Sequence, residues 1–210
     1  MNTAPILYSF RRCPFAMRAR MALASSGIQV ELREVKLSDM PESMLKLSPK
    51  ATVPVLLTSE GLVVDESLDV MVWSLSLADP QHWLDINEAA NQLIKRCDEE
   101  FKPLLDCYKY ADRHPDLSQA EHRIRAEVFL RELNHLLSLH AYLGDDRCRL
   151  PDVAIFPFIR QFAGVDAAWF EGSEYALLRH WLNKMLSNPL FQKVMHKYPF
   201  WQPGDKTVYL

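Results

Sequence analysis

Two patterns of predicted secondary structure follow one another along the chain, and the change between them limits the folds that the chain can adopt. Over residues 4–78, short apolar strands alternate with helical stretches, whereas from Asp85 onward there are helical patterns and no convincing strand. The segment Asp79–His82 contains a proline and breaks both patterns. The sequence therefore predicts an α/β domain at 1–78, a linker at 79–84 and an all-helical domain at 85–210.

The order of elements in the first part points to one topology. The elements predicted in this part are a strand at Pro5–Phe10, a helix at Pro14–Ser26, a strand at Val30–Val35, a helix at Asp39–Leu47, strands at Val53–Thr58 and Leu62–Val64, and a helix at Glu66–Leu77. The turn at Ser59–Gly61 indicates an antiparallel hairpin between the last two strands. A parallel βαβ half joined to a ββα half is the order of a thioredoxin-like fold.

The second part is predicted to consist of helices alone. Apolar residues recur there with helical spacing in long stretches that His114-Pro115 and Gly144-Asp145 interrupt. The predicted helices are Ile86–Asp112, Gln119–Leu143, Asp152–Phe162, Tyr175–Leu186 and a short one at Leu190–His196.

Composition and charge exclude several classes of function. The formal net charge of −3 gives no case for nucleic acid or an acidic membrane surface as a partner. The apolar runs are too short or too interrupted to span a bilayer. Arg11 and Arg12 follow the first apolar run instead of preceding it, which is not typical of a secretory signal. No cysteine–histidine cluster has zinc-site spacing. We therefore expect a cytoplasmic protein without metal, membrane or nucleic-acid partners.

Among the four cysteines, Cys13 has the setting of a reactive thiol. It lies between a predicted strand and a predicted helix, and Pro14 suits the first helical position. At that N-cap the sulfur would face unpaired N–H groups and the positive end of the helix dipole, and both favour the thiolate. The first thirty residues contain four arginines and no acidic residue. A buried structural cysteine is the alternative, which this combination of features disfavours.

The residue three positions after Cys13 is Ala16 and not a second cysteine. An internal disulfide of the CxxC kind is therefore excluded. The resolving thiol must come from another molecule, and a small thiol such as glutathione is the natural candidate. The other cysteines, Cys97, Cys107 and Cys148, lack a basic helix-start setting and are interpreted as structural.

Four motifs in order resemble the cytosolic glutathione transferase superfamily, in particular its cysteine-containing, omega-like and glutaredoxin-like members. The motifs are Cys13-Pro14-Phe15-Ala16, Lys50–Leu56, Glu66-Ser67 and Leu150–Phe158. The resemblance covers nearly the whole chain. It implies a thioredoxin-like domain followed by a helical-bundle domain, which is the glutathione transferase fold.

The resemblance also implies a role for each residue of a glutathione site. Pro54 would match the family's cis-proline, and the backbone of Val53 would pair with the cysteinyl part of glutathione. Glu66 and Ser67 would hold the γ-glutamyl end, with a plain helix N-cap as the alternative. Lys36 would meet the glycyl carboxylate, with a solvated surface charge as the alternative.

In this family the second substrate lies between the domains, against the first helices of the C-terminal half. The residues that could line its pocket are Phe101, Leu104, Leu105 and Tyr108, with core packing as the alternative.

The second domain departs from the family at one position, since Arg149 stands where Ser or Thr is usual, three residues before Asp152. We expect a weaker or differently built helix cap there, at a cost of about 1 kcal/mol, and no change of fold.

The activity that the resemblance implies is glutathione-dependent thiol transfer, in which the Cys13 thiolate attacks a glutathionylated or electrophilic substrate. Conjugation of glutathione to small electrophiles, with Tyr8 or Ser9 as the activating residue, is one alternative. A non-catalytic member that serves as a protein-binding module is the other. The family also suggests a homodimer, with glutathione as co-substrate and no metal.

Overall fold

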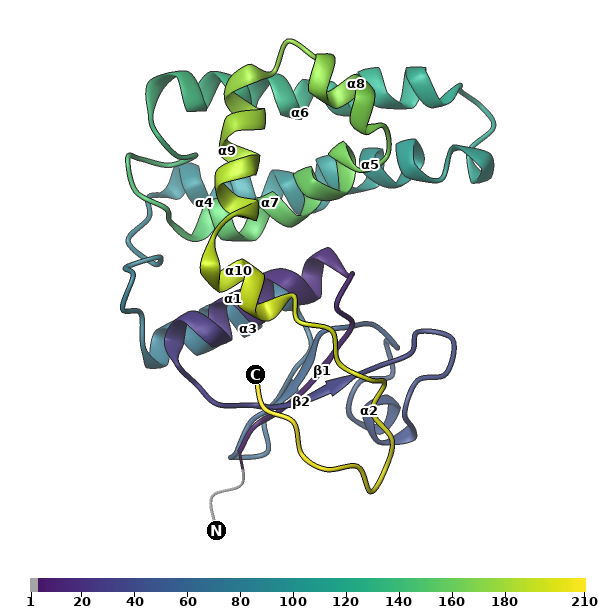
Figure 1. Cartoon of the computed structure of the whole chain (residues 1–210), viewed down its shortest axis with the longest axis vertical. Coiled ribbons are helices and arrows are strands. Elements are labelled where there is room, and N and C mark those ends of the chain that lie inside the picture. Colours follow the sequence, from purple (N-terminus) through teal and green to yellow (C-terminus); the bar gives the residue numbers. More distant parts are fainter. Residues whose placement is uncertain (1–3) are drawn as a thin grey trace. The chain divides into compact units, whose positions relative to one another are not determined.

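The computed structural model describes residues 4–210, and contacts divide the chain into two compact units (Figure 1). Unit 1 comprises the residues up to His82 together with Asn188–Leu210, and unit 2 comprises Trp83–Ser187. The predicted helical region 85–210 therefore differs from unit 2 at its C-terminal end. Its last part belongs to unit 1 because helix α10 (Pro189–Val194) packs on the first helix there, a contact that no local pattern encodes.

Unit 1 contains a four-stranded mixed sheet and is thioredoxin-like, as predicted. Its elements before the linker are β1 (Ile6–Ser9), α1 (Pro14–Ser26), β2 (Glu31–Glu34), α2 (Glu42–Leu47), β3 (Val55–Leu57), β4 (Val63–Val64) and α3 (Ser67–Leu77). The strands lie in the order β2-β1-β3-β4. Strand β1 is parallel to β2 and antiparallel to β3, and β3 is antiparallel to β4.

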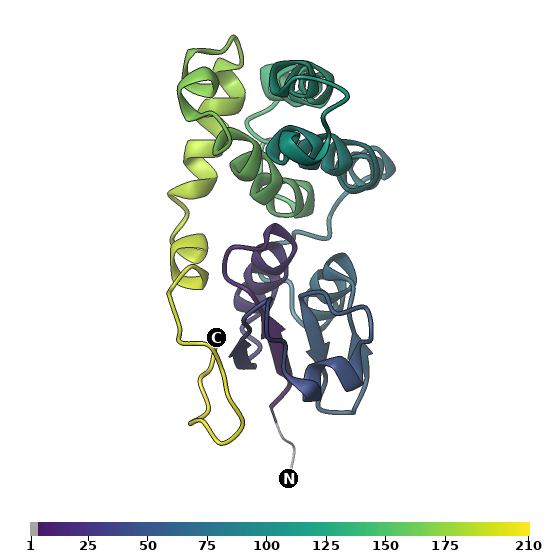
Figure 2. The same cartoon turned by 90° about the vertical axis from the view of Figure 1, so that its right-hand side faces the viewer.

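Helices α1 and α3 pack side by side on this sheet (Figures 1 and 2). An apolar cluster beneath them includes Leu7 and Leu56 from the strands, Leu23 from α1 and Val70 from α3. Helix α1 ends at Gly27, whose φ of 72° lies in the left-handed region that favours glycine. This packing fixes the start of α1 against the ends of the strands.

The C-terminal segment 195–210, here called the tail, runs along the free edge of β2. The N–H of Leu32 donates to the carbonyl of Val208 at 2.8 Å, and the N–H of Trp201 donates to the carbonyl of Glu34 at 2.7 Å. The sequence predicted no strand in this part of the chain, and that expectation misses the pairing. The tail lacks an alternating apolar pattern, and its backbone bonds depend on the β2 edge being open.

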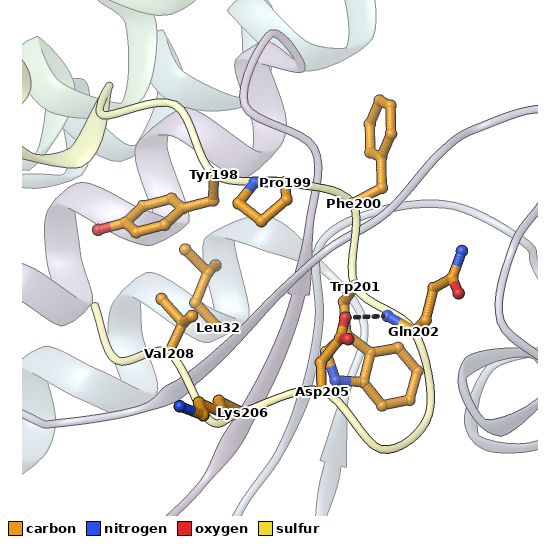
Figure 3. A pocket seen from close by; sticks show the side chains of 9 residues that line it. All are labelled: Leu32, Tyr198, Pro199, Phe200, Trp201, Gln202, Asp205, Lys206 and Val208. Atoms are coloured by element: carbon orange, nitrogen blue, oxygen red, sulfur yellow. Dashed lines mark hydrogen bonds between the residues drawn. The ribbon is translucent and has the colours of Figure 1, made fainter.

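A cavity of about 400 Å³ lies between the tail and β2 (Figure 3). The residues that line it are Leu32, Tyr198, Pro199, Phe200, Trp201, Gln202, Asp205, Lys206 and Val208. The Arg33 guanidinium lies 4.2 Å from the centre of the Trp201 ring, and that ring meets the Tyr8 ring edge-on at 6.1 Å. Trp201 thus anchors the tail to both β1 and β2.

We predict that Trp201→Ala lowers the free energy of unfolding by about 2 kcal/mol, because it removes an aromatic contact and a cation–π contact. The neighbouring Phe200 is 50% exposed, so Phe200→Ala should change stability by less than about 0.5 kcal/mol. Urea unfolding of the two variants measures the difference. Equal losses would show that the tail has no anchor at Trp201.

Unit 2 is all-helical, as predicted. Its elements are α4 (Glu88–Arg96), a π-helical turn (Cys97–Phe101), α5 (Lys102–Lys109), a 3-10 turn (Ala111–Arg113), α6 (Gln119–Leu139), α7 (Leu150–Ala163), α8 (Ala167–Gly172) and α9 (Ala176–Leu186). Within residues 4–210, no helix combines the length and the apolar character needed to cross a membrane.

The helix predicted at Ile86–Asp112 contains the π-helical turn, which no local sequence pattern indicates. The N–H of Lys102 donates to the carbonyl of Cys97, five residues earlier. Pro103 follows and has no N–H to donate, so the regular ladder cannot continue through it. Helix α8 was also not predicted, because its six residues are too few for a periodic pattern.

The carboxylate of Asp152 is buried at the start of α7. It accepts from the N–H groups of Leu143 and Arg149, both at 3.0 Å, and from the Trp181 indole N–H at 2.8 Å. The Arg149 side chain meanwhile pairs with Asp145 at 3.1 Å. This confirms the differently built cap, in which only the Asp152 half of the capping box operates. Burial raises the pKa of Asp152 to about 6.

The raised pKa gives the stability of the protein a testable pH dependence. Between its ordinary value of 3.8 and about 6, the folded state binds a proton at Asp152 more readily than the unfolded chain does. When the pH is lowered from about 7 to about 4, the free energy of unfolding of the wild type should therefore rise relative to that of Asp152→Asn, by up to about 3 kcal/mol. Urea unfolding of both proteins across this range measures the difference. A difference independent of pH would contradict the prediction.

Candidate active site

Cys13 occupies the position that the sequence predicted, at the N-cap of α1 and directly before Pro14. Its backbone N–H donates to the carbonyl of Phe10 at 2.9 Å, which closes the turn between β1 and α1. Its Sγ lies 3.6 Å from the carbonyl oxygen of Val53. The Val53–Pro54 peptide is cis, as the resemblance implied. The thiol and the cis-proline loop are therefore neighbours.

Next to this loop lies a second cavity of about 400 Å³, here called the thiol-side cavity. The residues that line it are Phe15, Lys50, Thr52, Val53, Pro54, Asp65, Glu66 and Ser67. Four of them were predicted to bind glutathione, and Cys13 adjoins the cavity through its contact with Val53. Lys36 is not among the lining residues. It is exposed and forms a backbone bridge with Asp39 in the turn after β2.

Ser67 is the first residue of α3, and its hydroxyl oxygen accepts from Nε of Arg18 at 3.0 Å. Both side chains are buried. Since the guanidinium occupies an acceptor position of Ser67, the hydroxyl proton remains available to donate to a ligand. The buried cation and the N-terminus of α3 together favour an anionic group at this point of the cavity.

Lys50 and Asp65 are site residues to which the sequence analysis gave no role. Nζ of Lys50 lies 2.6 Å from a Glu66 carboxylate oxygen and 3.0 Å from an Asp65 oxygen. The other Asp65 oxygen accepts from the Ser48 hydroxyl at 2.7 Å. The hydrogen bonds from Ser48 and Lys50 hold the pKa of Asp65 below its ordinary value, and those to Glu66 and Asp65 raise the pKa of Lys50. Lys50 begins the motif Lys50–Leu56 and Asp65 directly precedes Glu66-Ser67, and these positions were the available signal.

The positive charge near the thiol is smaller than the four arginines of the first thirty residues suggested, because one of them is paired with an acidic side chain. Arg20 is fully buried and pairs with Glu34 at 3.4 Å. The backbone N–H of Arg11 donates to the other Glu34 oxygen at 2.6 Å. Burial raises the pKa of Glu34 above its ordinary value. The first thirty residues contain no acidic side chain of their own, but Glu34 from β2 lies among them. Its carboxylate offsets the positive charge of Arg20 and accepts from the backbone of Arg11, just before Cys13.

The predicted co-substrate residues lie in unit 2. Phe101, Leu105 and Tyr108 are buried there, and Leu104 is half-buried. The Phe101 ring stacks on a phenylalanine of α6 with centroids 4.9 Å apart, and the Tyr108 ring meets one of α7 at the same separation. Three of the four residues, Phe101, Leu105 and Tyr108, are therefore part of the core of unit 2.

Among residues 4–210, no cluster of three or more histidine, cysteine or acidic side chains could hold a metal ion. Burial raises the pKa of the Cys148 thiol far above its ordinary value, so this thiol stays protonated. Cys97 is fully buried. Cys13 and Cys148 are both half-buried, but Cys13 directly precedes the first residue of a helix, at its N-cap.

We predict that Ser67→Ala lowers the free energy of unfolding by about 1–3 kcal/mol, because it removes a buried hydroxyl that accepts from Arg18. The matched control is Ser76→Ala on the same helix. The Ser76 hydroxyl is exposed and donates to the carbonyl of Trp73, so its loss should cost less than about 0.5 kcal/mol. Chemical unfolding of both variants makes the comparison. A cost at Ser67 no larger than at Ser76 would contradict the role given to the Arg18 contact.

Comparisons with known proteins find one family and several relatives that this chain is similar to. The family of glutathione S-transferase N-terminal domains matches residues 7–81. The chain is 25% identical to "Glutathione S-transferase omega-1" of Sus scrofa over 197 residues, which cover 92% of this chain and 77% of that protein. It is 34% identical to "Probable glutathione transferase" of Aplysia californica over 70 residues, 33% of this chain and 76% of that protein.

The fold also matches solved structures. One is a glutathione transferase family member from Pseudomonas fluorescens pf-5 with two glutathione molecules bound. The TM-score is 0.78 at 19% sequence identity, and the match covers 91% of this chain and 92% of that one. At that identity the likeness concerns the fold.

Proposed function

The chain belongs to the glutathione transferase superfamily, with omega-like relatives, and from this premise we propose that it is a thiol transferase that uses the Cys13 thiolate. The enzyme binds glutathione as co-substrate and removes glutathione from mixed disulfides. The observation that carries the proposal is the 3.6 Å contact between Cys13 Sγ and the Val53 carbonyl, at the edge of the thiol-side cavity.

Glutathione docks in this cavity with its γ-glutamyl group toward Glu66 and Ser67. The Ser67 hydroxyl and the start of α3 receive the carboxylate, and Glu66 accepts from the ammonium. The backbone of Val53 pairs with the cysteinyl part, as an added strand would. Because Val53 also contacts Cys13, this pose brings the ligand sulfur next to the Cys13 sulfur.

The reaction follows thiol–disulfide exchange. The Cys13 thiolate attacks the glutathione-side sulfur of a mixed disulfide, the bond between the two substrate sulfurs breaks, and the other thiol leaves after taking up a proton. Cys13 then carries glutathione. The thiolate of a second glutathione attacks that sulfur, releases oxidised glutathione and restores the Cys13 thiolate. One disulfide and one thiol are consumed and one of each is formed.

The alternative of hydroxyl-assisted conjugation has weaker support. The Tyr8 hydroxyl accepts from Arg33 at 2.6 Å and donates to Ser43 at 3.0 Å, and the Tyr8 side chain is buried. Ser9 is fully buried. Neither residue is among those that line the thiol-side cavity. These contacts favour Cys13 as the group that meets the glutathione sulfur.

We predict that Cys13→Ser lowers the rate of mixed-disulfide reduction by at least about a thousandfold, because the hydroxyl is not a nucleophile at neutral pH. A glutathionylated peptide is the substrate, and release of oxidised glutathione is measured. Cys107→Ser is the control and should retain full activity. Unchanged reduction by the Cys13 variant would overturn the assignment.

Two further readouts separate the proposal from its alternatives. Turnover of an aryl halide by Cys13→Ser, at or above the wild-type rate, would assign conjugation to another group. A wild-type protein that passes through immobilised glutathione unretained would favour a binding module. The proposal also includes a cytoplasmic location, a homodimer and a small electrophile or mixed disulfide as co-substrate, on the basis of the family likeness.

A further inference from the structure

In the thiol-side cavity, a cation of the chain itself occupies the acidic corner. The Lys50 ammonium contacts Glu66 at 2.6 Å and Asp65 at 3.0 Å. The second Asp65 oxygen is held by the Ser48 hydroxyl, so this carboxylate has a fixed orientation. All three charged residues of the corner line the cavity. Two carboxylates with one primary ammonium between them form a subsite for an ammonium group.

The loop that carries Lys50 is bent toward this corner. Ala51 has a φ of 53°, in the left-handed region, and its N–H donates to the carbonyl of Ser48 at 3.3 Å. The resulting turn connects α2 to β3 and directs the lysine to the residues before α3. The Lys50 side chain is itself 50% exposed, so its ammonium can move into solvent without unpacking the core.

We propose that Lys50 is a built-in competitor for the α-ammonium of the γ-glutamyl group. This inference rests on the proposed function, in which that end of glutathione docks at Glu66 and Ser67. The ligand ammonium must displace the Lys50 ammonium, since both need the Glu66 carboxylate. The ligand ammonium therefore contributes to the binding free energy only the difference between its own contacts and those that Lys50 loses.

A substrate property follows from this competition. A ligand without an ammonium at this end leaves the ion pairs of Lys50 intact. Its affinity is therefore only slightly lower than that of glutathione. The site therefore accepts acyl-cysteinyl thiols that lack the amino group almost as well as glutathione. In a cavity without the lysine, the ammonium would have both carboxylates to itself and would contribute more to binding.

The test measures the affinity ratio of two ligands in Lys50→Met. S-methylglutathione and its deamino counterpart carry the same carboxylates, and neither can react with Cys13. Loss of the lysine charge changes their common interactions equally, so that effect cancels in the ratio. Titration calorimetry should give a preference for the ammonium-bearing ligand about fivefold larger in Lys50→Met than in the wild type.

Lys50→Arg keeps the positive charge and should retain the wild-type ratio, while Lys50→Gln should reproduce the result of Lys50→Met. An unchanged or smaller ratio in both neutral variants would overturn the competitor role, even where glutathione binding itself persists. A wild-type protein that binds neither ligand would instead overturn the proposed function. Unfolding curves of all variants should coincide, because Lys50 lies at the surface.

Discussion

The antiparallel pairing of β1 with β3 sets the position of the site on which the proposed chemistry depends. Tyr8 lies opposite Val55 in this pairing. Because the strands run in opposite directions, the turn that follows β1 lies beside the loop that precedes β3. Cys13 ends that turn, and Val53 lies in that loop, two residues before β3. Their contact at 3.6 Å is the meeting of two segments that are forty positions apart in the sequence.

The same sheet also organises the buried charges. Glu34, on β2, offsets the buried Arg20 and accepts from the backbone before Cys13. Its own backbone carbonyl receives the N–H of Trp201 from the tail. One residue of β2 thus links α1, the turn before the thiol and the C-terminal tail. The tail in turn covers the edge of β2, which would otherwise present unpaired backbone groups.

Two groups of charged side chains near the start of α3 differ in how easily their contacts can be replaced. Arg18 and Ser67 form a buried pair that stays in place and offers a hydroxyl proton. Lys50, Asp65 and Glu66 form a more exposed group whose contacts can be replaced by those of a ligand. Exposed ion pairs are weak and are readily exchanged, whereas buried hydrogen bonds to a guanidinium are costly to break. In the proposed pose of glutathione, the cavity therefore combines a buried end for the carboxylate with a cation that the ligand replaces.

The sequence by itself determined the order of strands and helices, the thioredoxin-like topology, and the place of Cys13 at the start of α1. These features depend on neighbours within a few residues: Pro14 at the first turn, Ala16 in place of a second cysteine, and periodic apolar residues. The tertiary structure alone decided the Arg18–Ser67 and Lys50–Glu66 contacts, the Arg20–Glu34 pair and the pairing of the tail with β2. Each joins segments that are distant in the sequence, and no local pattern encodes which distant side chain will meet another once the strands have paired.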